Sequence, residues 1–150
     1  MGLAVYLGML HAAEQTLAES WRLVADGHAA EADLHHLGHQ LGGRADARVE
    51  MLAPLTERYG ERYDDEPERL EAQGLGALRS GPVGLLRYLQ DLYLLASFVA
   101  ITWDLVGQAA QATRDREALD VVAHAQPEVR NQIAFLRTRM EQAAPQALAG

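Results

Sequence analysis

Four long segments of this chain repeat apolar residues every three or four positions, and this periodicity constrains the fold more than any other feature. Residues at that spacing lie on one face of an α-helix, and no segment alternates with the period of a β-strand. Glycine and proline separate the segments and predict helices over 3–26, 33–59, 82–113 and 115–142. We therefore expect an all-α four-helix bundle, folded as a single domain over residues 1–150.

The connections between the predicted helices differ in length. Two of them are only a few residues long, so the first and second helices, and the third and fourth, should form antiparallel hairpins. The connection over residues 60–81 is much longer and includes a short helical piece around Glu66–Gln73. At about 3.3 Å per extended residue it reaches across the roughly 40 Å length of the bundle. We expect a long crossover here, with the third helix parallel to the second.

Composition excludes several classes of protein. The chain has no cysteine and no lysine, which excludes disulfides, thiolate catalysis and a lysine Schiff base. Its net charge of −8 argues against binding to nucleic acid or to an anionic membrane surface. The N-terminus has no basic region before its apolar residues, and no uncharged apolar run reaches the length of a membrane span. These features favour a cytoplasmic protein.

Polar residues interrupt the apolar stripes at one depth of the predicted bundle. Glu14 lies on the stripe of the first helix, with His11 one turn before it, and Arg48 lies on the stripe of the second. His124 and Glu128 are four residues apart and therefore share a face of the fourth helix. Counting residues from each turn places all five at a similar depth if the long connection is a crossover.

A long-crossover bundle with an inward Glu14 and a His124/Glu128 pair resembles the ferritin-like superfamily, the bacterial di-iron and di-manganese carboxylate proteins. Members of that family place a Glu on helices one and three, and Glu-x-x-His on helices two and four. Here Glu14 matches the first position, the second helix offers Arg48, and the fourth has His-x-x-x-Glu. The resemblance implies a metal site of His11, Glu14, His124 and Glu128 for iron, manganese or zinc, and an oxidase or oxygenase activity.

Two other functions remain open from the residues alone. Arg48 beside Glu14 predicts a buried ion pair, or an anchor for a small-molecule anion in a pocket with Tyr88, Phe98 and Trp103. The third helix is apolar on nearly all faces, which is typical of a central helix or of a dimer interface. The chain would then be a homodimeric interaction protein without catalysis.

Two further features of the second helix invite a functional explanation. His28, His35, His36 and His39 gather near its start, and the spacing of His35 and His39 suits two metal ligands or a solvated, pH-sensitive face. The pair Gly42-Gly43 costs up to about 1 kcal/mol per glycine in a helix. Such a pair allows close approach of a neighbouring helix or leaves room for a ligand.

Overall fold

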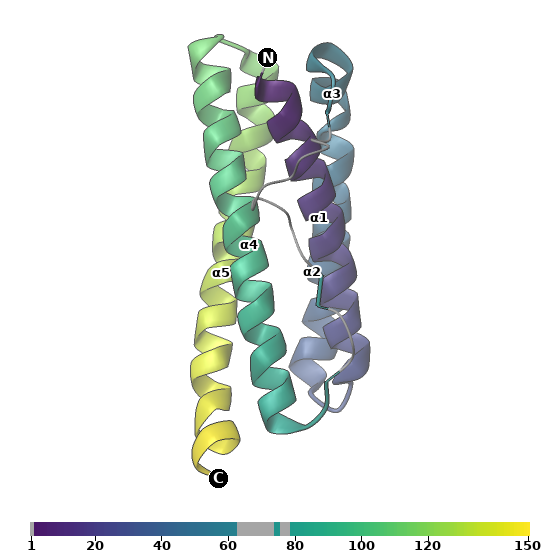
Figure 1. Ribbon diagram of the computed structural model, residues 1–150, viewed down its shortest axis with the longest axis vertical. Helices are drawn as coiled ribbons and strands as arrows, with labels where there is room; N and C mark the ends of the chain where they lie inside the picture. The colour runs from purple at the N-terminus through teal and green to yellow at the C-terminus, as the bar shows by residue number, and fades with distance from the viewer. Residues whose placement is uncertain (1, 63–73, 76–78) are drawn as a thin grey trace.

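The computed structural model describes residues 2–62, 74–75 and 79–150 (Figure 1). It consists of α1 (Gly2–Gly27), α2 (Ala32–Met51), α3 (Ala53–Tyr59), α4 (Gly81–Ala112) and α5 (Arg116–Ala149). The described residues contain no β-strand, so the prediction of an all-α protein with four long helices is confirmed. The helical piece expected at Glu66–Gln73 lies outside the described residues.

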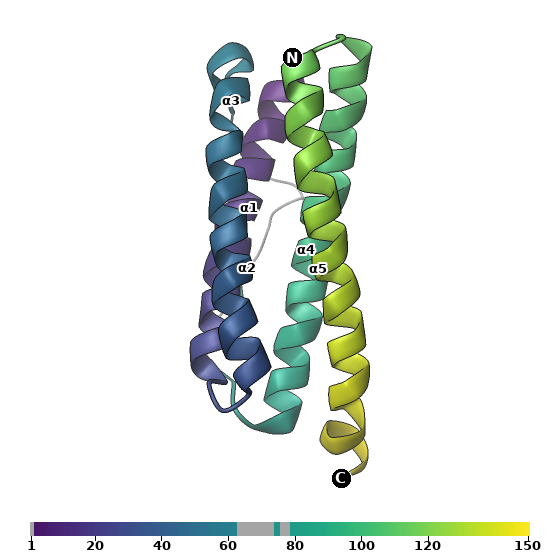
Figure 2. The ribbon, with the colours of Figure 1, turned by 180° about the vertical axis from the view of Figure 1, so that it is seen from behind.

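The helices lie side by side along one long axis (Figures 1 and 2). α1 descends from the N-terminus, and α2 returns to the upper end, where α3 lies (Figure 1). α4 starts at the lower end and rises, and α5 descends to the C-terminus. α2 and α4 therefore run in the same direction, because the chain leaves α3 at one end of the bundle and enters α4 at the other.

The four long helices enclose the core through three helix–helix contacts. α1 packs along α2 and along α4, and α4 packs along α5, whereas α2 and α5 touch at few points. Figure 2 shows α2 and α5 facing each other across this fourth side. Leu10 and Leu17 of α1 are fully buried, so Glu14 between them projects into the interior. Any polar group there needs partners from neighbouring helices.

Two boundaries differ from those expected. The second segment is two helices, separated at Leu52, because Pro54 starts a new first turn where its missing N–H is not required. The expectation that the last helix ends before Pro145 is wrong, since α5 continues to Ala149. Pro145 is exposed, and the hydrogen bond that it removes lies beyond the core.

Glycines on α2 allow its close approach to α1. A Cβ atom at Gly38 would lie 2.8 Å from the Cβ of Ala25, and one at Gly42 would lie 3.2 Å from the carbonyl oxygen of Ala18. The expected role of Gly42 in helix packing is thus confirmed, whereas Gly43 faces open space. This close contact brings the middle of α2 near the polar residue in the middle of α1.

Candidate functional site: a buried arginine between two glutamates

A buried ion pair joins α1 to α2. The Arg48 Nε donates to Glu14 Oε2 at 2.5 Å, and its NH2 group donates to Glu14 Oε1 at 2.9 Å. Both side chains are fully buried. The guanidinium fork matches the two carboxylate oxygens, which is the strongest geometry for such a pair. The predicted Arg48–Glu14 ion pair is therefore confirmed.

Two more side chains extend this pair to the other long helices. Trp103 of α4 donates its Nε1–H to Glu14 Oε2 at 2.9 Å. Glu128 of α5 accepts from NH1 of Arg48 at 3.2 Å and is only partly exposed. The network thus takes one residue from each of the four long helices. It also connects α2 to α5 on the side where these helices touch little.

The charges in the network explain why Arg48 stays ionised in the core. Burial by itself disfavours the charged form of the Arg48 guanidinium and lowers its pKa. The hydrogen bonds and negative charges of Glu14 and Glu128 outweigh this effect of burial, so the pKa of Arg48 is raised above its usual value. Two carboxylates and one guanidinium carry a formal net charge of about −1. The network therefore offers no free positive charge to an anion.

The two histidines expected beside Glu14 lie beside other carboxylates. His11 turns toward the connection after α3, where its Nδ1 lies 2.7 Å from Glu61 Oε2. His124 is 61% exposed, and its Nε2 lies 3.8 Å from Glu128 Oε2. In the described part of the chain, His11, Glu14, His124 and Glu128 are not among the groups with ligand atoms close enough to share a metal ion.

The aromatic residues expected around Arg48 are divided between two levels of α4. Trp103 belongs to the network, but Tyr88 lies 15 residues earlier, about 22 Å away along the helix. The Tyr88 ring packs edge-on against His28 at 5.6 Å and beneath the Arg79 guanidinium. Phe98 is half-buried. Arg48, Tyr88, Phe98 and Trp103 therefore do not line one pocket.

A second buried polar pair was not predicted from the sequence. Trp21 of α1 donates its Nε1–H to Gln132 Oε1 of α5 at 2.8 Å, and both side chains are buried. Gln132 follows Glu128 by one helical turn, and Trp21 follows Glu14 by two, so both continue the same inward faces. That spacing was the signal from which the pair could have been predicted.

One open cavity lies at the lower end of the bundle. It has a volume of about 340 Å³ and is lined by the α1–α2 turn, the start of α4 and the end of α5. Its one arginine, Arg139, is paired with Glu31 and Asp33. The charge of that side chain is already neutralised, so it provides no anchor for an anion.

The outer face of α4 carries four exposed apolar side chains. Val83, Leu94, Ile101 and Leu105 are 50%, 67%, 53% and 46% exposed. α4 is also the one described helix that is long and apolar enough to cross a membrane, although 44% of its most apolar window is buried in the bundle. A helix with an apolar face on both sides is typical of a core helix that also binds a partner.

Comparison of the chain with protein-family models, with curated proteins and with solved structures finds no match. The fold and the site therefore define its class, which is an all-α protein of four long packed helices with a charged network in its core.

Proposed function

We propose that this chain is a ferritin-like bundle whose central polar site holds a guanidinium. The directions of the four long helices, with α2 parallel to α4, support the ferritin-like assignment (Figure 1). Glu14 and Glu128 also lie at one depth on the first and last helices, joined through Arg48.

The residues at this centre do not fit a metal ion. Arg48 NH1 and Nε already bind the carboxylates of Glu128 and Glu14. A metal ion between those carboxylates would lie against a buried positive charge, which interior electrostatics oppose strongly. An anionic ligand does not fit either, because Glu14 and Glu128 surround the arginine. We therefore assign the network a structural role.

The function that follows is that of a non-catalytic interaction protein which pairs with a second copy through α4. The observation that carries this proposal is the exposed apolar face formed by Val83, Leu94, Ile101 and Leu105. Their spacings of 11, 7 and 4 place them within about 40° of one line along the helix. The face extends for about 33 Å, which matches the length of a helix–helix interface.

A second copy fits this face because the spacing is symmetric about Leu94. Val83 and Leu105 each lie 11 residues from Leu94. A two-fold axis at Leu94 therefore places each Val83 opposite the other copy's Leu105, and the two Leu94 residues opposite each other. Ile101 then faces Arg87, whose aliphatic stem covers apolar surface while its charged end reaches water.

The distribution of charge favours the same face. The chain has 13 basic and 21 acidic residues, yet α4 carries only Arg87, Asp91 and Asp104 among its 32 residues. Two copies of so acidic a chain repel each other over most of their surface. Contact along α4 avoids that repulsion and removes the exposed apolar side chains from water.

Analytical ultracentrifugation of tag-free protein at micromolar concentration tests this proposal. We expect a dimer for the unchanged chain and a monomer for Leu94→Glu, because that substitution places two carboxylates opposite each other at the axis. Leu94 is 67% exposed, so the substitution spares the core. Leu148→Glu is the matched control, since Leu148 is 71% exposed on α5, and it should leave the dimer intact.

A monomeric unchanged chain would overturn the proposal, and so would a dimer that tolerates Leu94→Glu as well as Leu148→Glu. Flotation with phospholipid vesicles provides the complementary measurement. If the unchanged chain floats with vesicles and Leu94→Glu does not, the partner of α4 is a membrane rather than a second copy.

A further inference from the structure

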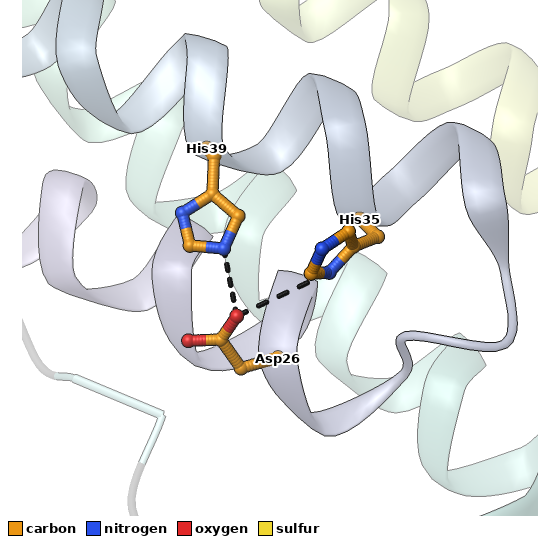
Figure 3. Close-up of side chains that lie close together, drawn as sticks. All are labelled: Asp26, His35 and His39. Atoms are coloured by element: carbon orange, nitrogen blue, oxygen red, sulfur yellow. Dashed lines mark hydrogen bonds and ion pairs between the residues drawn. The ribbon is translucent and has the colours of Figure 1, made fainter.

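Three potential metal ligands meet near the turn between α1 and α2 (Figure 3). Asp26 lies in the last turn of α1, and His35 and His39 lie on successive turns of α2. One ligand atom from each side chain lies within 4.8 Å of the other two. Among the described residues, this is the group of histidine and carboxylate side chains close enough to hold an ion.

The two imidazoles converge on one carboxylate oxygen. His39 Nε2 lies 2.7 Å and His35 Nδ1 lies 4.0 Å from Asp26 Oδ1. Zinc bonds to nitrogen and oxygen are about 2.0–2.2 Å long, which places neighbouring tetrahedral ligands about 3.3 Å apart. The three side chains are exposed, and the His35 and His39 rings pack edge-on at 5.2 Å, so rotations of exposed side chains would bring the ligand atoms to this spacing.

A backbone contact holds the His35 ring. Its Nδ1 lies 2.8 Å from the carbonyl oxygen of Ala25, one of the last carbonyls of α1. A carbonyl only accepts, so Nδ1 donates here, and it is also the His35 nitrogen that lies 4.0 Å from Asp26 Oδ1. A metal ion beside Asp26 therefore requires the exposed His35 ring to rotate until the lone pair of a ring nitrogen faces the ion.

We propose that Asp26, His35 and His39 bind one divalent transition-metal ion of the zinc class. Two imidazoles and one carboxylate suit zinc and its neighbours better than calcium or magnesium, which prefer oxygen ligands alone. The ion would link the end of α1 to the start of α2 and leave at least one coordination position open to solvent. This site is independent of pairing through α4.

The same contacts also have a simpler structural explanation. His35 satisfies a free carbonyl at the end of α1, and His39 pairs with Asp26, so together they hold the turn without a metal. The two explanations differ in one measurable respect. Only a metal site makes the stability of the protein depend on zinc concentration.

Isothermal titration of tag-free, chelator-treated protein with zinc chloride distinguishes them. We expect one equivalent of zinc to bind to the unchanged chain and to raise its melting temperature. His39→Gln and Asp26→Asn each remove one of three ligands and should weaken binding by at least about tenfold. His36→Gln is the matched control, because His36 is an exposed histidine next to His35 outside the group.

Zinc-free urea unfolding shows separately whether each variant is folded. Absence of zinc binding to the unchanged chain would overturn the proposal. Equal binding by His39→Gln, Asp26→Asn and His36→Gln would also overturn it, because the ion would then lie elsewhere. Affinity should fall as the pH is lowered below neutral, since protons compete with zinc for imidazole nitrogens.

Discussion

The residue that most needs explanation is Arg48, a fully buried charge held by Glu14 and Glu128. Removing one member of a buried ion pair leaves the other charge unpaired, at a typical cost of 3–5 kcal/mol. We expect Arg48→Met to lower the free energy of unfolding by about that amount. Urea unfolding followed by tryptophan fluorescence measures it, since Trp21 and Trp103 are fully buried in the folded state.

The double variant Glu14→Gln/Arg48→Met is the informative control. It removes both charges of the fully buried pair, leaves Glu128 where that side chain is partly exposed, and keeps a side-chain oxygen that can accept from Trp103, so most of the lost stability should return. If the double variant is as unstable as Arg48→Met, the cost arises from lost packing volume, and the explanation through an unpaired carboxylate is wrong.

The pairing of Arg48 with Glu14 was predictable because depth in a bundle follows from counting residues back to a short turn. The directions in which the His11 and His124 side chains point were not predictable from the sequence. One residue turns a helix by about 100°, so a side chain beside an inward stripe faces either the core or the solvent. His11 faces Glu61 and His124 is largely exposed, and the packing of neighbouring helices decides both.

At the scale of the helices, Asp115 joins α3 to the start of α5. It begins α5 by accepting from the backbone N–H of Ala118, and it also binds the Tyr59 hydroxyl and, at 2.7 Å, the Arg58 guanidinium from α3. The Tyr59 hydrogen bond is the main cause that lowers the pKa of Asp115 from its usual 3.8, helped by the Ala118 N–H and Arg58. The junction of α3 with the α4–α5 turn therefore depends on an ionised carboxylate.

The lowered pKa predicts a defined pH dependence for Asp115→Asn. A carboxyl whose pKa is lower in the folded state stabilises the protein above its unfolded pKa, and this contribution disappears as the pH falls through the folded value. Asparagine keeps the N-cap but loses the charge. We expect a loss of about 1 kcal/mol at neutral pH, which vanishes in urea unfolding at strongly acidic pH.

Glu141→Gln serves as the control for this measurement. Glu141 forms an exposed pair with Arg137, and such pairs contribute little to stability. A loss for Asp115→Asn that stays constant down to strongly acidic pH would contradict the role of its charge.

The helices themselves were predictable because apolar periodicity and turn residues are local signals. The junction at Asp115 was not predictable from the sequence, because it depends on where α3 lies after the helix break at Leu52. The Gly38 contact with Ala25 was missed for a related reason. A single glycine on a helix gives no sign of its neighbour until the other helix is in place.

At the scale of the whole molecule, the proposed dimer makes a prediction that no single variant can test. An antiparallel two-fold pair brings position 94 of one copy next to position 94 of the other. Leu94→Glu and Leu94→Lys should each be monomeric alone, because each places like charges together. An equimolar mixture should form heterodimers, since opposite charges then face each other.

Sedimentation of the mixture, compared with each variant alone, measures this directly. Added salt should weaken the mixed dimer, because it screens the attraction between the partly exposed charges.

A parallel arrangement that keeps the two copies of position 94 adjacent would also give heterodimers, so a second mixture is needed. In a mixture of the Val83→Glu and Leu105→Lys variants, the two opposite charges should pair only when α4 is antiparallel to its copy. Only then does position 83 of one copy lie opposite position 105 of the other. If the position-94 mixture pairs and the 83/105 mixture does not, the interface is real but its helices run in the same direction.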